Sequence, residues 1–461
     1  MSEARFVAVV DIGKTNAKLA LHDLDTRRDL FVATRPNTPL DGPPYRHFDV
    51  EGLWAFLLGA LMDCAARHPV EAICVTTHGA CAALVGDAGL VLPILDYESE
   101  APQAGRTAYE AERPPFAETF SPPLPNGLNV GAQLFYLEKR FPDAFARARH
   151  LLFYPQYWAW RLTGVAASEV TSLGCHTDLW APERGAPSSL ARRRGWDRLM
   201  PPLRSAFDAL GPLREEIALA VGLGGRAVPV HCGIHDSNAS LLPHLLSRPA
   251  PLAVVSTGTW IIALAVGGTL RGLDPARDTL ANVDALGRPV PSARFMGGRE
   301  FDLLTERNAV TPQAEEIADV LEHGPFVLPT LAPGTGPAPG GSGAWSADPA
   351  ALSPGARTAA ATLYCALMTL RMLDTIGAKG PTVVEGPFAR NALYVESLAA
   401  LTRRPVIASD SATGTTAGSA LLARGADVSP SLATLPPPAR RDTRVEDYRR
   451  RWEALVGARC A

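Results

Sequence analysis

Two short segments far apart in the chain share one pattern. Residues 9–21 read VVDIGKTNAKLAL and residues 254–266 read VVSTGTWIIALAV, and each is an apolar run, a polar turn with glycine and a second apolar run. Apolar runs around such a turn predict a β-hairpin, and the backbone N–H groups and hydroxyls at its tip can hold phosphate oxygens. Two copies therefore predict a duplicated architecture that holds one nucleotide, and hence a phosphotransferase.

The bulk properties of the chain describe a globular protein of more than one domain. A length of 461 residues exceeds what one ordinary core supports, and 47% apolar with 20% charged residues are globular values. A net charge of −3 offers no broad attraction to nucleic acid or to an anionic membrane, so we expect neither partner. The seven cysteines include no CxxC pair, which favours reduced thiols in a cytoplasmic protein over disulfides or a zinc site.

Residues 250–268 carry no charge, so a membrane span has to be considered. Pro251 and the polar turn at residues 256–259 interrupt the run, and β-branched residues flank the turn. These features favour a buried hairpin over a spanning helix. The charged N-terminus MSEARF leads directly into a predicted strand, so we expect no signal peptide.

Strands alternate with helices along the chain, which predicts an α/β protein with a mixed sheet. In the first half we predict helices at residues 50–67, 134–141 and 157–162, strands at 72–76 and 228–231, and a helix from about 237. The second hairpin follows closely, so the predicted domains are 1–245 and 246–461. In the second domain we predict a loop at 325–345, a helix at 357–375, a strand at 383–384, a helix from about 391 and a peripheral helix at 448–455.

The first hairpin turn, residues 11–16, contains GKT and invites comparison with a P-loop. A Walker A motif needs a further glycine five positions before Gly13, where this chain has Ala8, and a helix after Thr15, where a strand is predicted. The P-loop interpretation therefore fails. Asp11 at the strand end could hold Mg²⁺ directly or through water; the alternative is a plain turn whose aspartate caps backbone N–H groups.

His235 and Asp236 lie between a predicted strand and a predicted helix. Phosphoryl transfer to an alcohol needs an acceptor for the hydroxyl proton and in-line placement. An aspartate suffices, although its ordinary pKa is about 3.9, because the hydroxyl becomes acidic only in the transition state. The alternative is that Asp236 is the N-cap of the helix, and composition does not separate the two.

Three further turns carry less specific signals. STGT at residues 256–259 gains its interest from its likeness to the first hairpin, the alternative being an ordinary turn. GPFARN at residues 386–391 places a glycine turn before a helix, which suits a flat base or a phosphate. The segment at 411–423 combines a hydroxyl-rich turn with a helix of small residues, for which we expect close helix packing.

Together these segments resemble the FGGY carbohydrate kinases, which are built on the actin/hexokinase-type ATPase scaffold. The matching segments follow the family's order over nearly the whole chain: DIGKTNAK, THGA, YPQYWAWRLTG, GIHDSNAS, STGTW, GPFARN and ATGTTAGSALLA. THGA is similar to the sugar-contact turn of xylulokinases, and STGTW is similar to the second phosphate motif of rhamnulokinases. Two departures stand out: Glu385 and Pro387 flank Gly386 where the family usually has consecutive glycines, and residues 96–100, DYESE, lack a basic or amide residue.

The resemblance implies two ribonuclease-H-like domains flanking a deep cleft, with sugar bound mainly by the first domain and MgATP mainly by the second. It implies that Asp236 is the base that takes the proton from a primary sugar hydroxyl, and that Asp11 and Asp236 organise Mg²⁺. The implied ATP and phosphate contacts are Gly13, Lys14, Thr15, Asn16, Gly258, Thr259, Gly386 and Asn391. The implied sugar contacts are His78, Glu98, Gln133, Gln156, Tyr157 and Asp236, the alternative for His78 being a satisfied buried histidine.

By this resemblance we expect an ATP-dependent kinase that phosphorylates a primary hydroxyl of a ketose, first a deoxyketose such as L-rhamnulose or L-fuculose. A pentulose such as xylulose is the next candidate substrate. An ATP-binding regulatory protein that kept the scaffold and lost transfer is the alternative from another functional class. A homodimer is left open.

Overall fold

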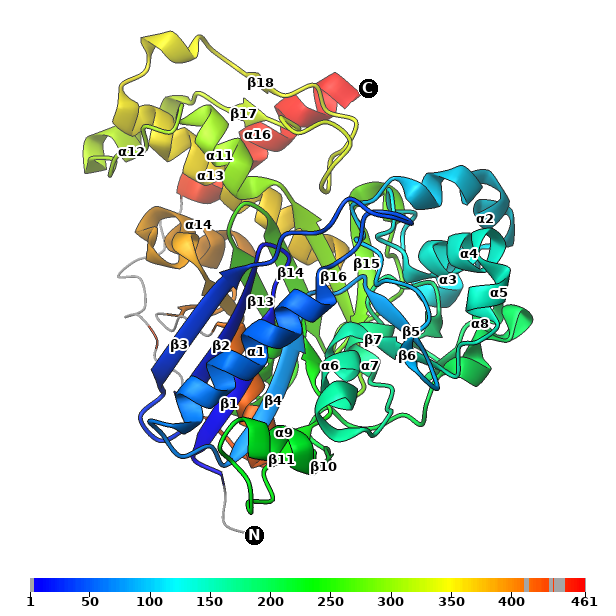
Figure 1. Cartoon of the computed structure of the whole chain (residues 1–461). Coiled ribbons are helices and arrows are strands. Elements are labelled where there is room, and N and C mark those ends of the chain that lie inside the picture. Colours follow the sequence, from blue (N-terminus) through cyan, green and yellow to red (C-terminus); the bar gives the residue numbers. More distant parts are fainter. Residues whose placement is uncertain (1–3, 410–413, 431–433, 435–443, 461) are drawn as a thin grey trace. The chain divides into compact units, whose positions relative to one another are not determined.

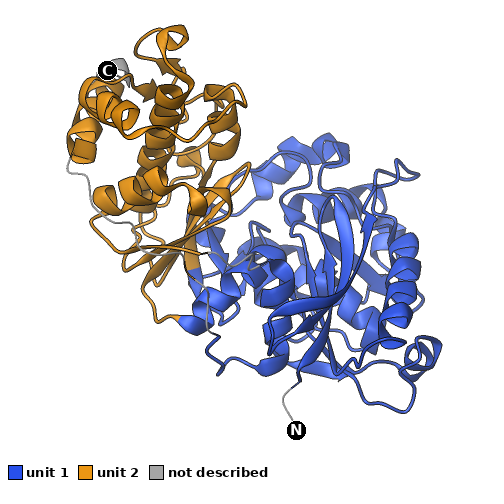
Figure 2. Cartoon of the chain, turned by 90° about the vertical axis from the view of Figure 1, so that its left-hand side faces the viewer, with its two compact units in different colours: residues 1–247, 281–289, 413–430 blue, residues 248–280, 290–412, 431–461 orange. Residues whose placement is uncertain are grey.

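The computed structural model describes residues 4–409, 414–430, 434 and 444–460, with strands and helices alternating along the chain (Figure 1). The chain forms two compact units, which Figure 2 colours separately. Unit 1 comprises residues 1–247, 281–289 and 413–430; unit 2 comprises residues 248–280, 290–412 and 431–461. The α/β class expected from the sequence is confirmed.

The sheet of unit 1 has the strand order β10-β11-β4-β1-β2-β3, with β12 also paired to β4. Its strands are β1 (Phe6–Ile12), β2 (Asn16–Asp23), β3 (Arg28–Pro36), β4 (Ala72–Thr77), β10 (Ala209–Pro212), β11 (Pro229–His231) and β12 (Ile234–His235). β1 runs antiparallel to β2 and parallel to β4, and the register sets Asp11 opposite Lys18 and Thr76. Residues directly opposite one another share a face of the sheet, so the ends of these strands gather polar side chains.

The remaining elements of unit 1 are mostly short helices. The helices are α1 (Val50–Ala65), α2 (Arg106–Glu112), α3 (Phe116–Thr119), α4 (Val130–Arg140), α5 (Pro142–Phe145), α6 (Tyr154–Thr163), α7 (Val170–Leu173), α8 (Ser189–Arg194), α9 (Glu215–Ala220), α10 (Asp236–Ser247) and α15 (Thr415–Ala420). Two small sheets add β5 (Ala82–Gly86), β6 (Gly89–Leu90), β7 (His150–Phe153), β8 (Trp180–Ala181) and β9 (Ala186–Pro187).

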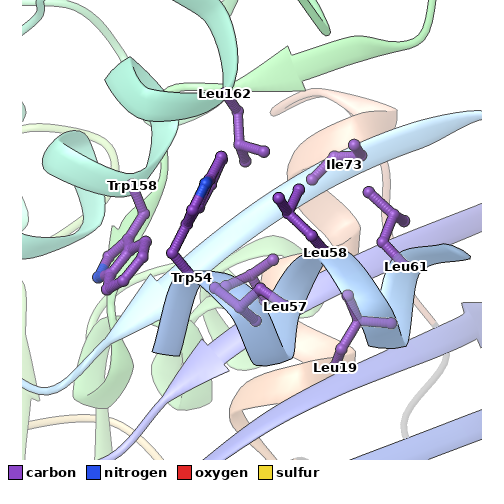
Figure 3. Close-up of a pocket in the computed structure, with 9 residues that line it drawn as sticks. Leu19, Trp54, Leu57, Leu58, Leu61, Ile73, Trp158 and Leu162 are labelled. Carbon is purple, nitrogen blue, oxygen red and sulfur yellow. The ribbon is translucent and has the colours of Figure 1, made fainter. Parts of the chain in front are cut away.

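Helix α1 covers the sheet with leucines spaced at helical intervals, and Asp49 caps it by accepting a hydrogen bond from the Gly52 N–H. Its side chains point toward α6 and the sheet around a narrow apolar gap (Figure 3). Trp54 of α1 and Trp158 of α6 stack there, with ring centroids 6.4 Å apart. The gap measures about 10 Å³, barely the volume that one water needs, so it is a packing defect and no ligand site.

The sheet of unit 2 has the strand order β15-β16-β14-β13-β19-β20. Its strands are β13 (Leu252–Thr257), β14 (Ile261–Val266), β15 (Thr279–Val283), β16 (Pro289–Phe295), β19 (Thr382–Glu385) and β20 (Val406–Ala408). The helices are α11 (Gly297–Leu304), α12 (Ala314–His323), α13 (Pro354–Thr375), α14 (Ala392–Thr402) and α16 (Arg444–Cys460). A separate ladder pairs β17 (Val327–Leu328) with β18 (Ala344–Trp345).

The predicted duplication of the hairpins is confirmed in the backbone. β1 pairs antiparallel with β2 and parallel with β4, while β13 pairs antiparallel with β14 and parallel with β19. Each unit therefore centres on a hairpin whose first strand also adjoins a later parallel strand. The aligned positions of the two hairpins can be compared directly, with Asp11 of the first matching Ser256 of the second.

The compact units differ from the predicted division at residue 245 in two segments. Residues 281–289 and 413–430 cluster with unit 1, although both come after that boundary. Helix α15 packs against α10, β1 and β4. A Cβ added at Gly418 would clash with the Ala239 carbonyl oxygen, so the close approach depends on small residues, as the sequence predicted. Residues 411–413 of that motif lie outside the described part of the chain.

One prediction about unit 2 was wrong, and another is borne out with longer bounds. Residues 325–345 were expected to form only a loop, but they contain the β17–β18 ladder. The last helix, predicted as peripheral at residues 448–455, spans Arg444–Cys460, exposes many of its side chains and buries Tyr448 and Trp452. The Tyr448 hydroxyl donates to the Pro325 carbonyl at 2.9 Å and the Trp452 indole donates to the Val327 carbonyl at 2.6 Å. Residues four apart share a helix face, so these two aromatics anchor α16.

The described residues also bear on the expectations about a membrane span and about the cysteines. None of their helices is long and apolar enough to span a membrane. Residues 252–266 instead form the β13–β14 hairpin. Six cysteines in the described part of the chain are buried.

Candidate active site

Asp236 lies at the junction of β12 and α10, beside the end of β4, where the register pairs His235 with Thr77. Its side chain is 29% exposed, and the Ser237 N–H donates to its Oδ1 at 2.6 Å. Burial raises the pKa of Asp236 to about 6, and the negative charge of Asp11 contributes in the same direction. The carboxylate is thus more basic than an ordinary aspartate while still ionised for the most part at neutral pH, as a proton acceptor requires.

His78 follows β4 and is buried among three aromatic rings. The ring centroids of Phe48, Tyr97 and Tyr154 lie 5.1, 5.4 and 5.1 Å from that of His78. Burial lowers the pKa of His78 to about 4, so the ring is neutral. Its Nδ1 lies 2.9 Å from the Gly79 carbonyl oxygen, while its Nε2 is buried with no partner among the described residues.

A neutral imidazole carries one N–H, and the Gly79 carbonyl assigns that proton to Nδ1. The unpartnered Nε2 of His78 is therefore an acceptor, suited to a ligand hydroxyl. An unpaired buried polar atom is costly unless something pairs with it, so the open Nε2 favours a ligand contact over a fully satisfied buried histidine, and the sugar contact of His78 stays a prediction.

Lys14, at the tip of the first hairpin, contacts residues 96–98. Its Nζ contacts Asp96 Oδ1, lies 3.2 Å from Glu98 Oε2 and sits 4.7 Å from the centroid of the Tyr97 ring. Arg46 Nε donates to Asp96 Oδ2 at 2.8 Å. Burial would raise the pKa of Asp96, but the hydrogen bonds from Lys14 and Arg46 outweigh it and lower that pKa.

The segment DYESE has no basic residue of its own, but Lys14 and Arg46 place two basic side chains against its Asp96. The structure brings together Lys14, predicted to hold phosphate, with Glu98, predicted to hold sugar. Because the Lys14 ammonium is occupied by two carboxylates, its position favours a sugar-side role. Its predicted phosphate contact remains untested.

Asp11 is buried at the end of β1 with two partners. Lys18 Nζ lies 3.2 Å from Asp11 Oδ2, and the Thr415 hydroxyl donates to the same oxygen. Sequence reasoning did not select Lys18 or Thr415. Lys18 could have been found from the hairpin register, which sets it opposite Asp11, whereas no local signal links Thr415 to residue 11.

No group of three or more His, Cys, Asp or Glu side chains suited to a metal occurs among residues whose positions are described. The two carboxylates of Asp11 and Asp236 are electrostatically coupled. Mg²⁺ is commonly held by one or two carboxylates together with water and phosphate oxygens. The donor set therefore fits magnesium that arrives with a nucleotide.

Hydrogen bonds within the turn and from Asn37 hold the tip of the first hairpin. The Gly13 N–H donates to the Asn16 carbonyl at 2.9 Å, and Asn37 donates through its side chain to the Gly13 carbonyl and through its N–H to the Thr15 carbonyl, both at 2.8 Å. Thr15 and Asn16 are exposed. The predicted phosphate turn therefore presents Thr15 and Asn16 outward on a fixed backbone.

Three residues predicted to contact sugar are fully or nearly fully buried and engaged with protein groups. Gln133 Nε2 donates to the Ala80 and Gly127 carbonyls at 2.6 and 2.5 Å. Gln156 Nε2 donates to the Cys232 and Gly233 carbonyls at 3.1 and 3.2 Å. Tyr157 packs in the core against Trp158. Direct sugar contact by these three remains a prediction; Tyr154, which the sequence reasoning missed, is the residue of α6 that adjoins His78.

Unit 2 holds a pocket of about 340 Å³ beside the second hairpin. Its lining residues are Gly258, Thr259, Gly298, Phe301, Asp302, Pro387, Phe388 and Asn391. Three of the four residues predicted for ATP in this half, Gly258, Thr259 and Asn391, thus come together. The sequence reasoning missed Gly298, Phe301 and Asp302, although the Gly297-Gly298 pair that begins α11 was a readable signal.

Glycine at two positions lets the backbone segments around this pocket approach. Gly386 has φ +82°, and a Cβ there would clash with the Thr257 carbonyl oxygen. A Cβ at Gly298 would clash with the Gly258 carbonyl oxygen. Gly386 therefore lies behind the turn and shapes the pocket.

Thr257 and Asn391 fix the other walls through hydrogen bonds. The Thr257 hydroxyl donates to the Glu385 carbonyl at 2.5 Å and accepts from the Phe388 N–H at 3.1 Å. Asn391 caps α14 by accepting from the Tyr394 N–H at 3.1 Å, and its Nδ2 donates to the Thr362 hydroxyl at 3.2 Å. Asn391 is thus a structural cap as well as a lining residue.

Comparison with known proteins relates the chain to sugar kinases. Residues 249–431 match the family model described as carbohydrate kinase FGGY, C-terminal domain. The L-fuculokinase of Escherichia coli K12 is 26% identical over 272 residues, which is 56% of this chain and 56% of that protein. The chain therefore spans little more than half the length of this curated relative.

Solved structures match over the whole length. A carbohydrate kinase from Novosphingobium aromaticivorans is 40% identical, with a TM-score of 0.91 and 100% of both chains covered. A xylulose kinase from Rhodospirillum rubrum is 19% identical, with a TM-score of 0.76 and 98% of both chains covered. A glycerol kinase from Plasmodium falciparum, solved with ADP, is 11% identical with a TM-score of 0.76 and 98% of both chains covered. The last two likenesses establish the fold alone.

Proposed function

The chain belongs to the FGGY family of carbohydrate kinases, and we propose that it transfers the γ-phosphoryl group of MgATP to a primary hydroxyl of a ketose. The observation that carries this proposal is Asp236, a partly exposed carboxylate of raised pKa in the same unit as the unpartnered His78 Nε2. A regulatory protein that only binds ATP has no use for a base matched to an alcohol, which argues against the non-catalytic alternative.

In the proposed reaction Asp236 accepts the proton of the sugar hydroxyl while the hydroxyl oxygen attacks the γ-phosphorus. The bond between that phosphorus and the β–γ bridging oxygen breaks, and ADP leaves. Lys18, beside Asp11, supplies positive charge for the phosphate oxygens. Magnesium held by Asp11 and Asp236 would neutralise phosphate charge when bound.

We assign the nucleoside of ATP to the pocket of unit 2. The volume of about 340 Å³ lies in the range of small-molecule sites. Phe301 and Phe388 give it apolar walls and Asp302 gives it a charged acceptor. Gly258 and Thr259, at the tip of the second hairpin, would hold phosphate oxygens through backbone N–H groups and the hydroxyl.

For the sugar we favour a deoxyketose such as L-fuculose or L-rhamnulose. The ring of Tyr97, which packs against His78 and is partly exposed, suits the C–H groups and methyl of such a sugar, while His78 Nε2 accepts from one hydroxyl. The similarity to an L-fuculokinase points the same way. A pentulose such as xylulose is the second candidate, because the THGA segment is similar to the sugar-contact turn of xylulokinases. The proposal includes a cytoplasmic enzyme that acts on sugar and ATP, without nucleic-acid or membrane partners.

The test is ADP release measured against a panel of ketoses, polyols and aldoses. We expect stimulation by a deoxyketose, and a fall of about 10²–10⁴-fold in kcat for Asp236→Asn. Asp208→Asn is the matched control, because Asp208 is a half-exposed aspartate of the same unit that pairs with Arg204. Retained ATP binding without stimulation by any acceptor would support the regulatory alternative, and full turnover by Asp236→Asn would refute the assignment of the base.

A further inference from the structure

Glu169 is a buried carboxyl that the proposed reaction does not use. It lies just before α7, is 1% exposed, and accepts hydrogen bonds from the Thr171 N–H at 2.9 Å and the Thr171 hydroxyl at 2.5 Å. Burial raises the pKa of Glu169 to about 7. Burying a carboxyl group costs free energy. We therefore asked which residues its hydrogen-bond partner, Thr171, contacts.

The partner, Thr171, reaches the segment that carries the base. Its Oγ1 accepts a hydrogen bond from the His235 N–H at 3.0 Å, one residue before Asp236. A threonine hydroxyl has one proton and two lone pairs. Because that proton goes to Glu169, a lone pair of Thr171 Oγ1 faces the His235 N–H. The donor and acceptor of each hydrogen bond from His235 to Glu169 are thereby fixed.

The same segment is held from two other sides. Gln156 donates to the carbonyls of Cys232 and Gly233, and a Cβ added at Gly79 would lie 2.7 Å from His235 Nε2. His235 Nε2 in turn lies 3.2 Å from Asp236 Oδ1. The residues before Asp236 are therefore fixed by contacts from α6, α7 and the turn after β4.

We infer that Glu169 and Thr171 are positioning residues that set the place of the Asp236 carboxylate through the backbone of His235. The inference rests on the proposed function, in which Asp236 is the base. A displacement of about 1 Å at a reacting group can cost about 100-fold in rate. The buried pair thus acts on kcat without contacting sugar or ATP.

Thr171→Val tests this inference, with Thr177→Val as the matched control. Both hydroxyls are buried, and that of Thr177 donates to the Leu173 carbonyl at 2.5 Å and accepts from the Leu179 N–H at 3.1 Å without touching residues 232–236. We expect Thr171→Val to lower kcat about 10–100-fold with the KM for MgATP unchanged. Thr171→Ser, which keeps the hydroxyl, should restore kcat, and Thr177→Val should leave kcat near wild type at a similar loss in Tm.

Equal falls in kcat for both valine variants, or no fall for Thr171→Val, would overturn the inference. If Thr171→Val does not fold, Glu169→Gln replaces it: the amide puts a donor where Thr171 needs an acceptor, so kcat should fall in a folded protein, and an unchanged kcat would refute the positioning role. Asp236→Asn is assayed in parallel. If that variant keeps full turnover, the proposed base is wrong, whereas an inactive Asp236→Asn beside a fully active Thr171→Val removes only the positioning role.

Discussion

The two hairpins have the same strand pairing, but the side chains at their tips differ in charge. The first has Asp11, Lys14 and Lys18 at or near its tip, all of them in ion pairs. The matching segment of the second, residues 256–263, holds no ionisable side chain and is shaped by the close backbone approaches of Gly298 and Gly386. One duplicated element has thus been specialised for charge in unit 1 and for shape in unit 2.

The largest effect that this comparison predicts is at the matching positions Asp11 and Ser256. Asp11→Asn removes the carboxylate proposed for magnesium, so we expect kcat to fall about 10²–10³-fold, the scale of losing a group aimed at transition-state charge. Ser256→Ala should change kcat by less than about threefold. Steady-state kinetics over a Mg²⁺ titration measure both, and comparable losses at the two positions would abolish the contrast.

Glycine-to-alanine substitutions should have the larger effect at the second hairpin, whereas the substitution of Asp11 has the larger effect at the first. Gly386→Ala forces a Cβ against the Thr257 carbonyl at a positive φ, so we expect a loss of about 3 kcal/mol in the free energy of unfolding. Gly13→Ala places its Cβ 3.2 Å from the Asn16 carbonyl, with no positive φ to strain it, and should cost less than about 1 kcal/mol. Urea unfolding of both variants decides; a larger cost at Gly13 would contradict the assignment of shape to unit 2.

Lys14→Met tests whether the Lys14 ammonium, at the tip of the first hairpin, serves sugar binding or phosphate binding. Because the ammonium contacts Asp96 and Glu98, we expect the KM for sugar to rise about tenfold, or ~1.4 kcal/mol, while the KM for MgATP stays within about twofold. The reverse split would restore the phosphate role. Lys139→Met, on the partly exposed side of α4, is the control for loss of a lysine.

The smallest effect concerns pH. The folded-state pKa of Asp96 is lowered by its hydrogen bonds with Lys14 and Arg46, so its stabilising contribution is complete above the unfolded value of about 3.9 and is lost as pH falls through the folded value. The difference in unfolding free energy between wild type and Asp96→Asn should therefore shrink from pH 6 to pH 3. The corresponding difference for Ser256→Ala should not depend on pH. Urea unfolding at both pH values measures this.

Local pattern was enough to predict the elements that carry the candidate site. The hairpins, α1, α13, and the strand-to-helix junction at Asp236 all follow from apolar periodicity and turn residues close together in the chain. The pairing of Lys14 with Asp96 joins residues 82 positions apart, and it depends on the direction of one side chain. No periodicity records that direction, so the sequence could not predict this pairing, and the phosphate contact assigned to Lys14 from its motif stays a prediction.

The same reasoning explains what was missed in unit 2. The adenosine contact of Gly386, implied by the family resemblance, stays a prediction. Its positive φ and its approach to Thr257 depend on β13 and β19 lying side by side, which the local sequence does not show. Asp302 and Phe301 reach the pocket only because α11 begins against the hairpin tip. A motif identifies a turn, while tertiary packing decides which of its atoms face the ligand.

The return of residues 413–430 to unit 1 has a consequence for synthesis on the ribosome. Thr415 donates to Asp11 across 404 positions of sequence, and α15 packs on β1 and β4. Since N-terminal segments emerge first during translation, nearly the entire polypeptide must leave the exit tunnel before the aspartate at its beginning acquires its last neighbour. Until then Asp11 lacks the hydrogen bond from Thr415 that it has in the complete fold.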